Sequence, residues 1–364
     1  MTKLLAVEEV LKDCILQKAF PCAAYAFGTA SHAFIGAVGR HTYDPASSII
    51  TEYSIFDIAS VTKVIGTTSV AMVLYQQGKL DLDLPVCEIL PEFASNGKQS
   101  ITPRMLLSHS SGLIPHRRYD QLTHDPDEAW WMVMHETPMT PPGKAFAYSC
   151  VGFLTLYQIL CKLIMGSNYD SASNEHRARV YNAFLYTEVL MRLGMNHTLH
   201  NPTAPKSLTA PPTEIPPGER DPIQGYVHDE NCRFFGGISG NAGLFSPIAD
   251  VSRFCQAILN NGAGVFKPDV LAEWCTPQDP AVSSRGLGWD TKSPSGSSAG
   301  SVLSHRSIGH TGFTGTSLWI DPENAIFVAL LTNRIYPTRE NGQLDEIRPR
   351  FADVCANILL SHMR

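Results

Sequence analysis

Ser60 and Lys63 place a hydroxyl and an amine three positions apart, and the residues after them are predicted to form a long helix. Side chains at positions i and i+3 of a helix lie on the same face. A serine hydroxyl is a poor nucleophile until a base removes its proton. A lysine amine can be that base when burial and neighbouring charge lower its pKa toward neutrality. The pair can therefore supply a nucleophile and a base without a histidine–aspartate pair.

The spacing of these two residues is a weak signal by itself. In ordinary helices a serine often caps the first turn while a lysine is solvated. Two more elements follow along the chain: Tyr148-Ser149, after Pro141-Pro142-Gly143-Lys144, and His310-Thr311-Gly312 near the C-terminus. Because three elements occur in this order, we favour the catalytic interpretation of Ser60 and Lys63 over the structural one.

The ordered set resembles the serine β-lactamase and D,D-peptidase superfamily, and within it the class C-like branch that includes the family VIII carboxylesterases. The resemblance extends from about Phe56 to Asn333. Four stretches support it, namely Leu106–Leu113, Val227–Asn231, Gly243–Ser246 and Gly309–Thr316. It implies a cofactor-independent and metal-independent serine hydrolase that forms an acyl-enzyme.

The resemblance also implies roles for individual residues. Lys63 would be the base, or the partner that keeps the base deprotonated. Tyr148 would move a proton between the nucleophile and the leaving group, although a tyrosine there could also be an ordinary core residue. The backbone N–H groups of Ser60 and Phe313 would bind the oxyanion of the transition state. Thr311 and Gly312 would lie on a strand beside the nucleophile, where glycine permits close backbone approach.

Three positions depart from the family pattern. His310 stands where many relatives have lysine, and a histidine is mostly neutral at pH 7. A neutral ester or amide is therefore favoured over a substrate that carries a carboxylate. Cys150 replaces a frequent asparagine, and a thiol is a poor substitute for an amide donor. Asn241 replaces a frequent histidine, and the sequence does not indicate the consequence.

A carboxylic ester is accordingly the predicted small-molecule substrate. A D-amino-acid peptidase or amidase acting on cell-wall fragments, with weak β-lactamase activity, would use the same residues, and so would an acyltransferase. A non-catalytic binding protein that kept the fold is the alternative outside the enzymes. The intact Ser60, Lys63, Tyr148 and His310 argue against that alternative.

Other motifs in the sequence compete with this site. Residues 296–300 fit the G-x-S-x-G pattern around Ser298, but they lie in a serine- and glycine-rich stretch predicted to be a loop rather than a strand–helix turn. His228-Asp229-Glu230 lacks the spacing of a metal site and is predicted to shape the pocket. Trp130 and Trp131 could line an acyl pocket or pack in the interior.

Composition limits the other classes of function. The chain has 364 residues, 44% hydrophobic and 17% charged, which is enough to bury a large core. With a net charge of −6 and scattered basic residues, we expect no nucleic-acid partner. The nine cysteines contain no C-x-x-C pair, and the N-terminus shows no signal pattern, so we expect reduced thiols in a cytoplasmic protein. Residues 145–161 are too few for a membrane span and are predicted to form a buried helix. The oligomeric state is not predicted.

Hydrophobic spacing and turn residues predict the secondary structure. Helices are predicted over Leu4–Lys18, Ser60–Gln77, Lys144–Met165, Asp250–Leu259 and Gln343–Met363, and another begins at Thr102-Pro103. Asp250 is the expected cap of its helix. Strands are predicted over Cys22–Ala30, Ala33–Val38, Thr316–Asp321 and Ala325–Thr332.

Pairing the early strands with the late ones in one antiparallel sheet, with the terminal helices on one face, gives an α+β protein. The resemblance implies a β-lactamase/transpeptidase-like arrangement in a single catalytic domain of residues 1–364. Its sheet lobe would comprise about residues 1–59 and 295–364, and an inserted, mostly helical lobe about residues 60–294. The active site would lie between the two lobes.

Overall fold

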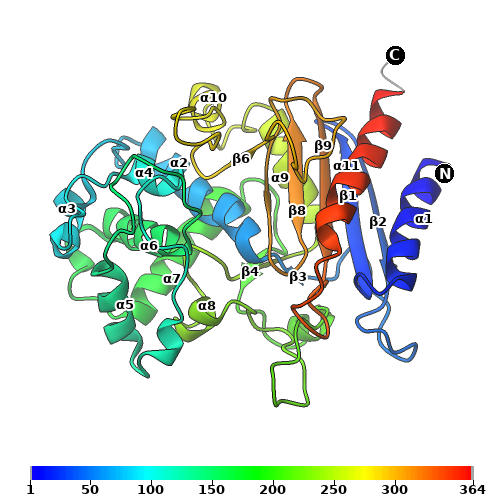
Figure 1. Cartoon of the computed structure of the whole chain (residues 1–364), viewed down its shortest axis with the longest axis horizontal. Coiled ribbons are helices and arrows are strands. Elements are labelled where there is room, and N and C mark those ends of the chain that lie inside the picture. The colour runs from blue at the N-terminus through cyan, green and yellow to red at the C-terminus, as the bar shows by residue number, and fades with distance from the viewer. Residues whose placement is uncertain (1, 362–364) are drawn as a thin grey trace.

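The structure is a computed structural model that describes residues 2–361, and the side chains from residue 5 onward. It is an α+β fold built on a six-stranded sheet with the strand order β2-β1-β9-β8-β7-β6 (Figure 1). The strands are β1 (Cys22–Thr29), β2 (Ala33–Gly39), β6 (Asp290–Thr291), β7 (Ile308–Thr311), β8 (Ser317–Asp321) and β9 (Ile326–Thr332). All neighbouring pairs are antiparallel. The predicted pairing of early with late strands is confirmed, since Ala26 of β1 lies opposite Ala329 of β9.

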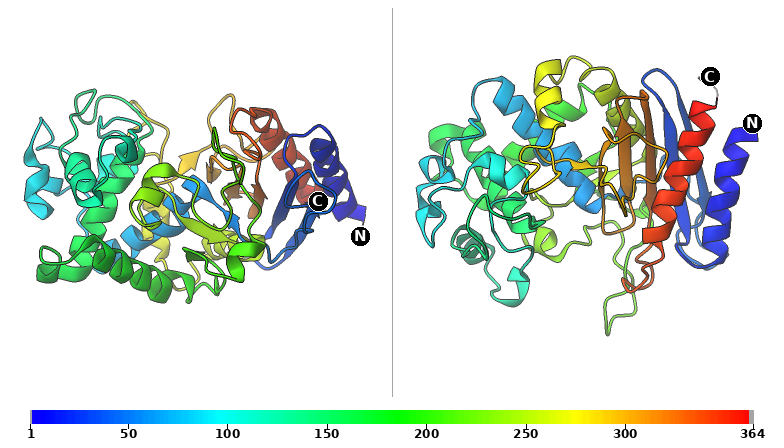
Figure 2. Two further views of the ribbon diagram at one scale, coloured as in Figure 1. Left: turned by 90° about the horizontal axis from the view of Figure 1, so that it is seen from below. Right: turned by 45° about the horizontal axis from the view of Figure 1, so that its top comes forward.

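Helices cover both faces of this sheet. Helices α1 (Thr2–Leu16) and α11 (Leu344–Leu360) lie side by side on one face, and α9 (Ile248–Leu259) packs on the other (Figures 1 and 2). Alternation along β9 explains the two layers, because Val328 and Leu330 join the apolar cluster of α1 and α11. Phe327, Ala329 and Leu331 join the larger cluster that contains α9. Successive side chains of one strand therefore hold two layers of helices.

The remaining helices form the part of the molecule on the left of Figure 1. They are α2 (Ser69–Gln76), α3 (Val86–Ile89), α4 (Pro103–Leu107), α5 (Pro126–Met134), α6 (Cys150–Met165), α7 (Asn174–Leu185), α8 (Glu230–Phe234) and α10 (Pro268–Trp274). Helix α6 is central and contacts α2, α4, α5 and α7. The segment Cys150–Asn168 is the one described helix that is long and apolar enough to cross a membrane, and 61% of its most apolar stretch is buried inside the protein.

A second, three-stranded sheet was not predicted. Its strand order is β3-β5-β4, and the strands are β3 (Phe56–Asp57), β5 (Leu244–Ser246) and β4 (Leu199–His200). Such short strands carry too little hydrophobic alternation to be recognised from sequence. Their pairing is nevertheless important, because it brings the chain just before Ser60 next to the chain just after Asn241.

Three predicted elements differ from the structure. The segment expected as one helix over Ser60–Gln77 begins as a 3₁₀ turn at 59–61 and continues as a π-helical stretch at 63–68 before α2. The helix expected from Lys144 begins only at Cys150, because the Ser149 hydroxyl accepts the Gly152 N–H at 2.9 Å and caps it. Asp250 lies inside α9 rather than at its cap.

Helix α9 also differs from the expected division into lobes. Its residues fall within the range expected for the helical lobe, yet it packs against β1, β8 and β9. The physical reason is its apolar face, which includes Val251, Phe254 and Ile258 and which the sheet buries.

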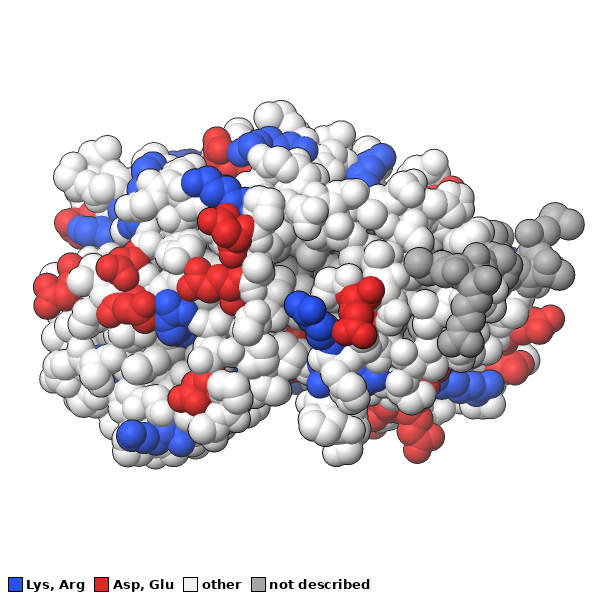
Figure 3. Space-filling view, turned by 90° about the horizontal axis from the view of Figure 1, so that it is seen from above, with Lys and Arg blue, Asp and Glu red and all other residues white. Residues whose placement is uncertain are grey.

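On the face of the molecule drawn in Figure 3, basic and acidic side chains are interspersed.

Asn333 ties three distant segments to the end of β9. Its side-chain amide donates to the carbonyls of His41 (3.0 Å) and Pro212 (2.8 Å), and its oxygen accepts from the Cys22 thiol. We predict that Asn333→Ala lowers the free energy of unfolding by about 3 kcal/mol, because two buried carbonyls lose their donors. Denaturant unfolding monitored by circular dichroism measures this.

Asn260 provides the matched control, since its amide donates to the Ala30 carbonyl at 2.8 Å on the exposed surface. We expect Asn260→Ala to cost less than about 1 kcal/mol. Equal losses for the two variants would contradict the structural role assigned to Asn333.

Candidate active site

Ser60 and Lys63 are in direct contact. The Lys63 Nζ lies 3.0 Å from the Ser60 Oγ, and the lysine side chain is fully buried. Ala59, just before the serine, adopts a left-handed backbone with φ of 46°, which is uncommon for a residue other than glycine. The turn is therefore held by its surroundings rather than by local preference. The Asp57 carboxylate is one of the groups that stabilise this turn, because it accepts the Ala59 N–H at 2.9 Å.

Lys63 has further partners from distant segments. Its Nζ donates to the Asn241 carbonyl at 2.9 Å and to the Cys150 Sγ at 3.5 Å, and it lies 5.1 Å from the centre of the Tyr148 ring. Burial alone would lower the pKa of Lys63, but the acidic groups of Cys150 and Tyr148 outweigh it and raise the pKa above its usual value. This direction is opposite to the lowering that a lysine base would need.

Cys150 and Asn241, two of the positions that depart from the family pattern, therefore both contact Lys63. The Asn241 side-chain oxygen accepts from Ser239 at 2.8 Å, so this residue presents its backbone carbonyl to the lysine. Burial raises the pKa of the Cys150 thiol, and the nearby Lys63 opposes this rise. No motif in the sequence indicated that these two positions share a partner.

Tyr148 lies in the loop just before α6 rather than in a helix. Its ring packs 4.5 Å from the ring of His109 and 5.9 Å from that of His310. The Ser149 N–H donates to the His109 Nδ1 at 3.0 Å, which fixes this loop. The Tyr148 hydroxyl is buried and has no hydrogen-bond partner among the described residues, so it is available to a ligand.

His310 belongs to β7 and is buried. Its Nδ1 lies 2.7 Å from the Thr311 carbonyl oxygen, and its Nε2 has no partner in the described part of the chain. Burial lowers the pKa of His310 well below its usual value, and the positive charges of Arg285 and Lys63 lower it further. The imidazole is therefore neutral at pH 7, as the sequence analysis expected.

The turn after β7 carries Phe313, the second expected oxyanion donor. Within residues 2–361, the Phe313 N–H donates to no protein group. Thr314 and Thr316 tie the turn to the chain before the nucleophile, because their hydroxyls donate to the carbonyls of Asp57 (2.7 Å) and Ile58 (2.9 Å). Gly312 permits this approach, since a Cβ there would meet the Ile58 carbonyl oxygen at 2.6 Å.

The predicted site residues line one cavity of about 590 Å³. Those that line it are Ser60, Tyr148, His310, Thr311, Gly312 and Phe313, and Lys63 lies behind them in contact with Ser60 and Cys150. The loop at 228–230 also lines this cavity, as predicted.

Neither Ser298 nor the two tryptophans contribute to this cavity. Ser298 accepts the indole N–H of Trp319 at 3.1 Å. Trp130 stacks on Phe235 in the interior, and Trp131 is exposed. Among the described residues, no three His, Cys, Asp or Glu side chains are grouped to hold a metal ion.

The cavity wall also contains four arginines that were not predicted, namely Arg285, Arg334, Arg339 and Arg348. Arg285 packs over the Tyr148 ring at 5.6 Å and pairs with Asp290 at 3.2 Å, yet its Nη1 has no partner among the described residues. Arg348 donates to the carbonyls of Gly312 (2.7 Å) and Thr316 (3.1 Å). Single arginines in loops and helices carry no motif, so no pattern in the sequence could have found them.

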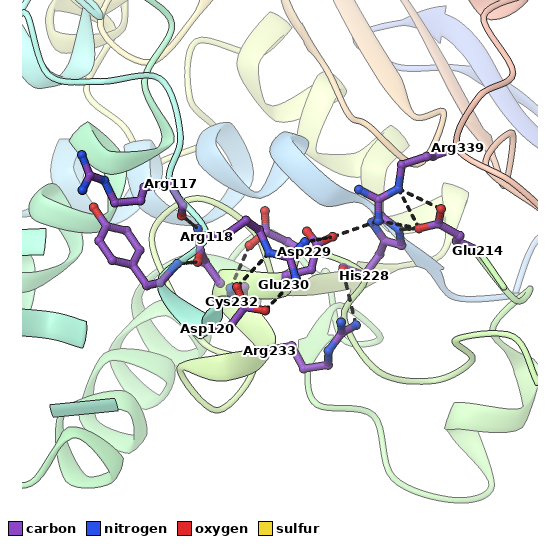
Figure 4. Close-up of polar contacts among 12 residues, drawn as sticks. Arg117, Arg118, Asp120, Glu214, His228, Asp229, Glu230, Cys232, Arg233 and Arg339 are labelled. Atoms are coloured by element: carbon purple, nitrogen blue, oxygen red, sulfur yellow. Dashed lines mark hydrogen bonds and ion pairs between the residues drawn. The ribbon is translucent and has the colours of Figure 1, made fainter. Parts of the chain in front are cut away.

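A network of ion pairs supports the Phe313 side of the cavity (Figure 4). The Arg339 guanidinium bridges Glu214 and Glu230, with its Nε 2.8 Å from both Glu214 oxygens and its Nη2 2.8 Å from Glu230. His228 contacts Glu214 at 2.9 Å and stacks on the Phe313 ring with centres 5.6 Å apart. The network thus holds the ring of Phe313. The next residue, Thr314, donates its hydroxyl to the Asp57 carbonyl.

The α+β fold, with the serine, lysine and tyrosine between its sheet and its helices, defines the class of β-lactamase-fold serine hydrolases. Comparisons with known proteins agree. The profile of the Beta-lactamase family matches residues 35–349. The chain therefore belongs to that family, as the resemblance in its motifs implied.

Individual relatives are distant. A putative D-alanyl-D-alanine carboxypeptidase of Salmonella agona (strain SL483) is 28% identical over 331 residues, which are 82% of this chain and 73% of the relative. A penicillin-binding protein homologue from Caulobacter crescentus has a TM-score of 0.75 at 18% identity, covering 99% of this chain and 98% of that one. A class C β-lactamase has a TM-score of 0.75 at 16% identity, covering 97% and 96%. These structural likenesses show the shared fold.

The Glu214 network makes stability depend on pH. Burial alone would raise the pKa of Glu214, but hydrogen bonds from Arg339 and His228 lower it from 4.5 to about 2. A depressed carboxyl pKa stabilises the fold above pH 4.5, and this stabilisation is lost as the pH falls toward 2. We predict that Glu214→Gln costs roughly 3 kcal/mol at pH 7, and that the difference from wild type shrinks between pH 4.5 and 2. Denaturant unfolding at several pH values measures it.

The exposed Glu219 is the control, since it makes no ion pair among the described residues. We expect Glu219→Gln to be nearly neutral at each pH. A Glu214→Gln difference that stays constant from pH 7 to pH 2 would contradict the assigned role of the carboxylate.

Proposed function

We propose that this protein is a serine hydrolase that works through an acyl-enzyme. The contact of 3.0 Å between the Ser60 Oγ and the Lys63 Nζ carries the proposal. The serine oxygen attacks a substrate carbonyl, the leaving group departs with a proton, and water then releases the acyl group. The N–H groups of Ser60 and Phe313 stabilise the oxyanion, a contribution of about 3 kcal/mol per donor.

The raised pKa of Lys63 supports the second of its two expected roles, that of the partner that keeps the base deprotonated. An ammonium cannot accept the Ser60 proton, so we assign Lys63 as the positive partner of the base. Tyr148 then relays the proton, because its oxygen accepts the Ser60 proton while its own hydroxyl proton passes to the leaving group. Its hydroxyl, which has no partner among the described residues, supports this assignment.

Two arginines of the cavity wall indicate the charge of the substrate. A neutral His310 by itself favours neutral esters, but Arg285 supplies positive charge beside that histidine. The Arg285 Nη1 and the Arg348 Nε are both buried without a partner in the described chain. We therefore infer a carboxylate-bearing substrate, cleaved by a peptidase or amidase on D-amino-acid fragments. The relative named as a putative D-alanyl-D-alanine carboxypeptidase supports this choice.

Ester hydrolysis is the second candidate. The neutral His310 and the thiol of Cys150 favour it, because neither group demands a charged or amide-bearing substrate. Transfer of the acyl group to another acceptor would use the same residues. The nine free cysteines support the expected cytoplasmic location.

The nucleophile can be tested directly. We predict that Ser60→Ala abolishes both p-nitrophenyl acetate hydrolysis and labelling by a fluorophosphonate probe, because no other serine or threonine hydroxyl is bonded to the Lys63 Nζ among the described residues. Ser298→Ala is the matched control. It removes one hydrogen bond to Trp319, and we expect it to keep at least half of the activity.

Labelling that survives in Ser60→Ala would remove Ser60 from the mechanism. A wild type that is neither labelled nor active, although folded, would favour the binding-protein alternative.

Substrate charge can be tested with Arg285. We predict that Arg285→Gln lowers kcat/KM for a peptide ending in D-alanyl-D-alanine by about tenfold or more, because a carboxylate loses a charge-assisted hydrogen bond. Hydrolysis of the neutral p-nitrophenyl acetate should change by less than about threefold. Arg306→Gln, at an exposed position outside the cavity, is the control.

Parallel losses on both substrates would contradict carboxylate recognition by Arg285. A wild type that hydrolyses only the neutral ester would favour the second candidate function.

A further inference from the structure

We propose that Asp229 binds a primary ammonium group on the acyl part of the substrate. The preferred substrates are then amino-acid derivatives with a free amino group. This proposal rests on the proposed acyl-enzyme function and specifies its substrate class.

Asp229 is one of two acidic residues in the cavity wall, and the other is Glu230. Glu230 is already neutralised, because it pairs with Arg118 at 3.3 Å and with Arg339 at 2.8 Å. Asp229 makes no ion pair with a described side chain. It is only partly exposed, and its carboxylate is the unpaired negative charge of this wall.

The two oxygens of Asp229 have different surroundings. Its Oδ1 accepts the Cys232 N–H at 2.8 Å and caps helix α8. Within residues 2–361, no group donates to its Oδ2. One oxygen therefore fixes the orientation of the carboxylate, and the other is free to accept a hydrogen bond from a ligand.

The charge of Asp229 acts on the nucleophile side of the cavity. It contributes to raising the pKa of Lys63, after the larger effects of burial, Cys150 and Tyr148. It also contributes to raising the pKa of Cys150, after the larger effects of burial and Lys63. Asp229 is therefore electrostatically close to the atoms that hold the serine.

Arg285 supplies a positive charge to the wall of the same cavity. Its guanidinium lies over the ring of Tyr148, the residue that delivers a proton to the leaving group. A carboxylate at Arg285 therefore belongs to the leaving group. An acyl group at Ser60 then extends toward Cys150 and Asp229, where an ammonium is the complementary charge. The cavity thus matches a substrate with a positive acyl part and a negative leaving part.

The test compares two p-nitroanilides of alanine, one with a free amino group and one N-acetylated, each as D and L forms. Wild type should have a kcat/KM at least about tenfold higher for the free amine, because a charged hydrogen bond is lost on acetylation. Asp229→Asn should abolish this preference, so that the ratio of kcat/KM for the free amine to that for the N-acetyl substrate falls at least about tenfold. Asparagine caps a helix as well as aspartate, so α8 keeps its cap.

Two further measurements separate this role from a structural one. The preference should decline as the pH rises through about 8, where an α-amino group loses its proton. Asp279→Asn is the matched control, because Asp279 is exposed, lies outside the cavity and also uses one oxygen to accept a backbone N–H. It should keep the preference intact.

The proposal is overturned if wild type shows no preference for the free amine, or if Asp229→Asn slows both anilides equally. It is also overturned if neither anilide is cleaved while Ser60 still reacts with a fluorophosphonate. Failure of Ser60 to react at all would instead overturn the proposed hydrolase function, so the two failures are distinguishable.

Discussion

The site depends on the burial of one cation. The Lys63 side chain has no exposed surface, and a buried ammonium costs several kcal/mol unless hydrogen bonds and nearby electron-rich groups compensate. Here Ser60, Cys150 and the carbonyl of Asn241 surround the nitrogen, and the Tyr148 ring lies 5.1 Å away. Three segments far apart in the sequence, residues 60–63, residues 148–150 and Asn241, must therefore meet at this nitrogen. The pairing of β3 with β5 in the second sheet and the position of the first residue of α6 bring these segments together.

The buried carboxyl group and the backbone of Asp57 support the turns that carry the two proposed oxyanion donors. Asp57 accepts the N–H of Ala59 at 2.9 Å and that of His228 at 2.7 Å. Burial raises the pKa of Asp57, while these two N–H groups oppose the rise. Its own carbonyl accepts the Thr314 hydroxyl, so one residue connects the strained turn before Ser60 with the loop of Phe313. The two backbone donors of the proposed oxyanion site are therefore held by a common support.

Several residues contribute charge to the cavity, so the residue at one motif position does not by itself predict the charge of the substrate. The histidine at position 310 is neutral, which by itself favours a neutral substrate. The wall nevertheless carries Arg285 and Arg348 on the β7 side and the unpaired Asp229 near the nucleophile. A site divided in this way discriminates by the position of charges on the substrate, not only by their number. Under the proposed function, Arg285, from the loop before β6, supplies the positive charge that the lysine of the family pattern would supply.

The sequence by itself determined the class of fold and indicated the residues that are proposed to react. Near-continuous apolar runs in residues 22–29, 317–321 and 326–332 predict strands buried on both faces, which can pair in one sheet. The S-x-x-K spacing puts Ser60 and Lys63 in contact, since a separation of three residues is local and needs only a helical turn. These features depend on neighbouring residues, and for that reason they could be predicted.

Only the tertiary structure decided the surroundings of Lys63 and the charge of the cavity. The raised pKa of Lys63 comes from Cys150 and Tyr148, more than eighty positions away in the chain. The turn before Ser60 departs from a regular helix because Asp57 and the small sheet hold it. Arg285 and Asp229 face the same cavity although nothing in their local sequence points there. Charge and burial are sums over residues that only folding brings together, and local patterns do not contain them.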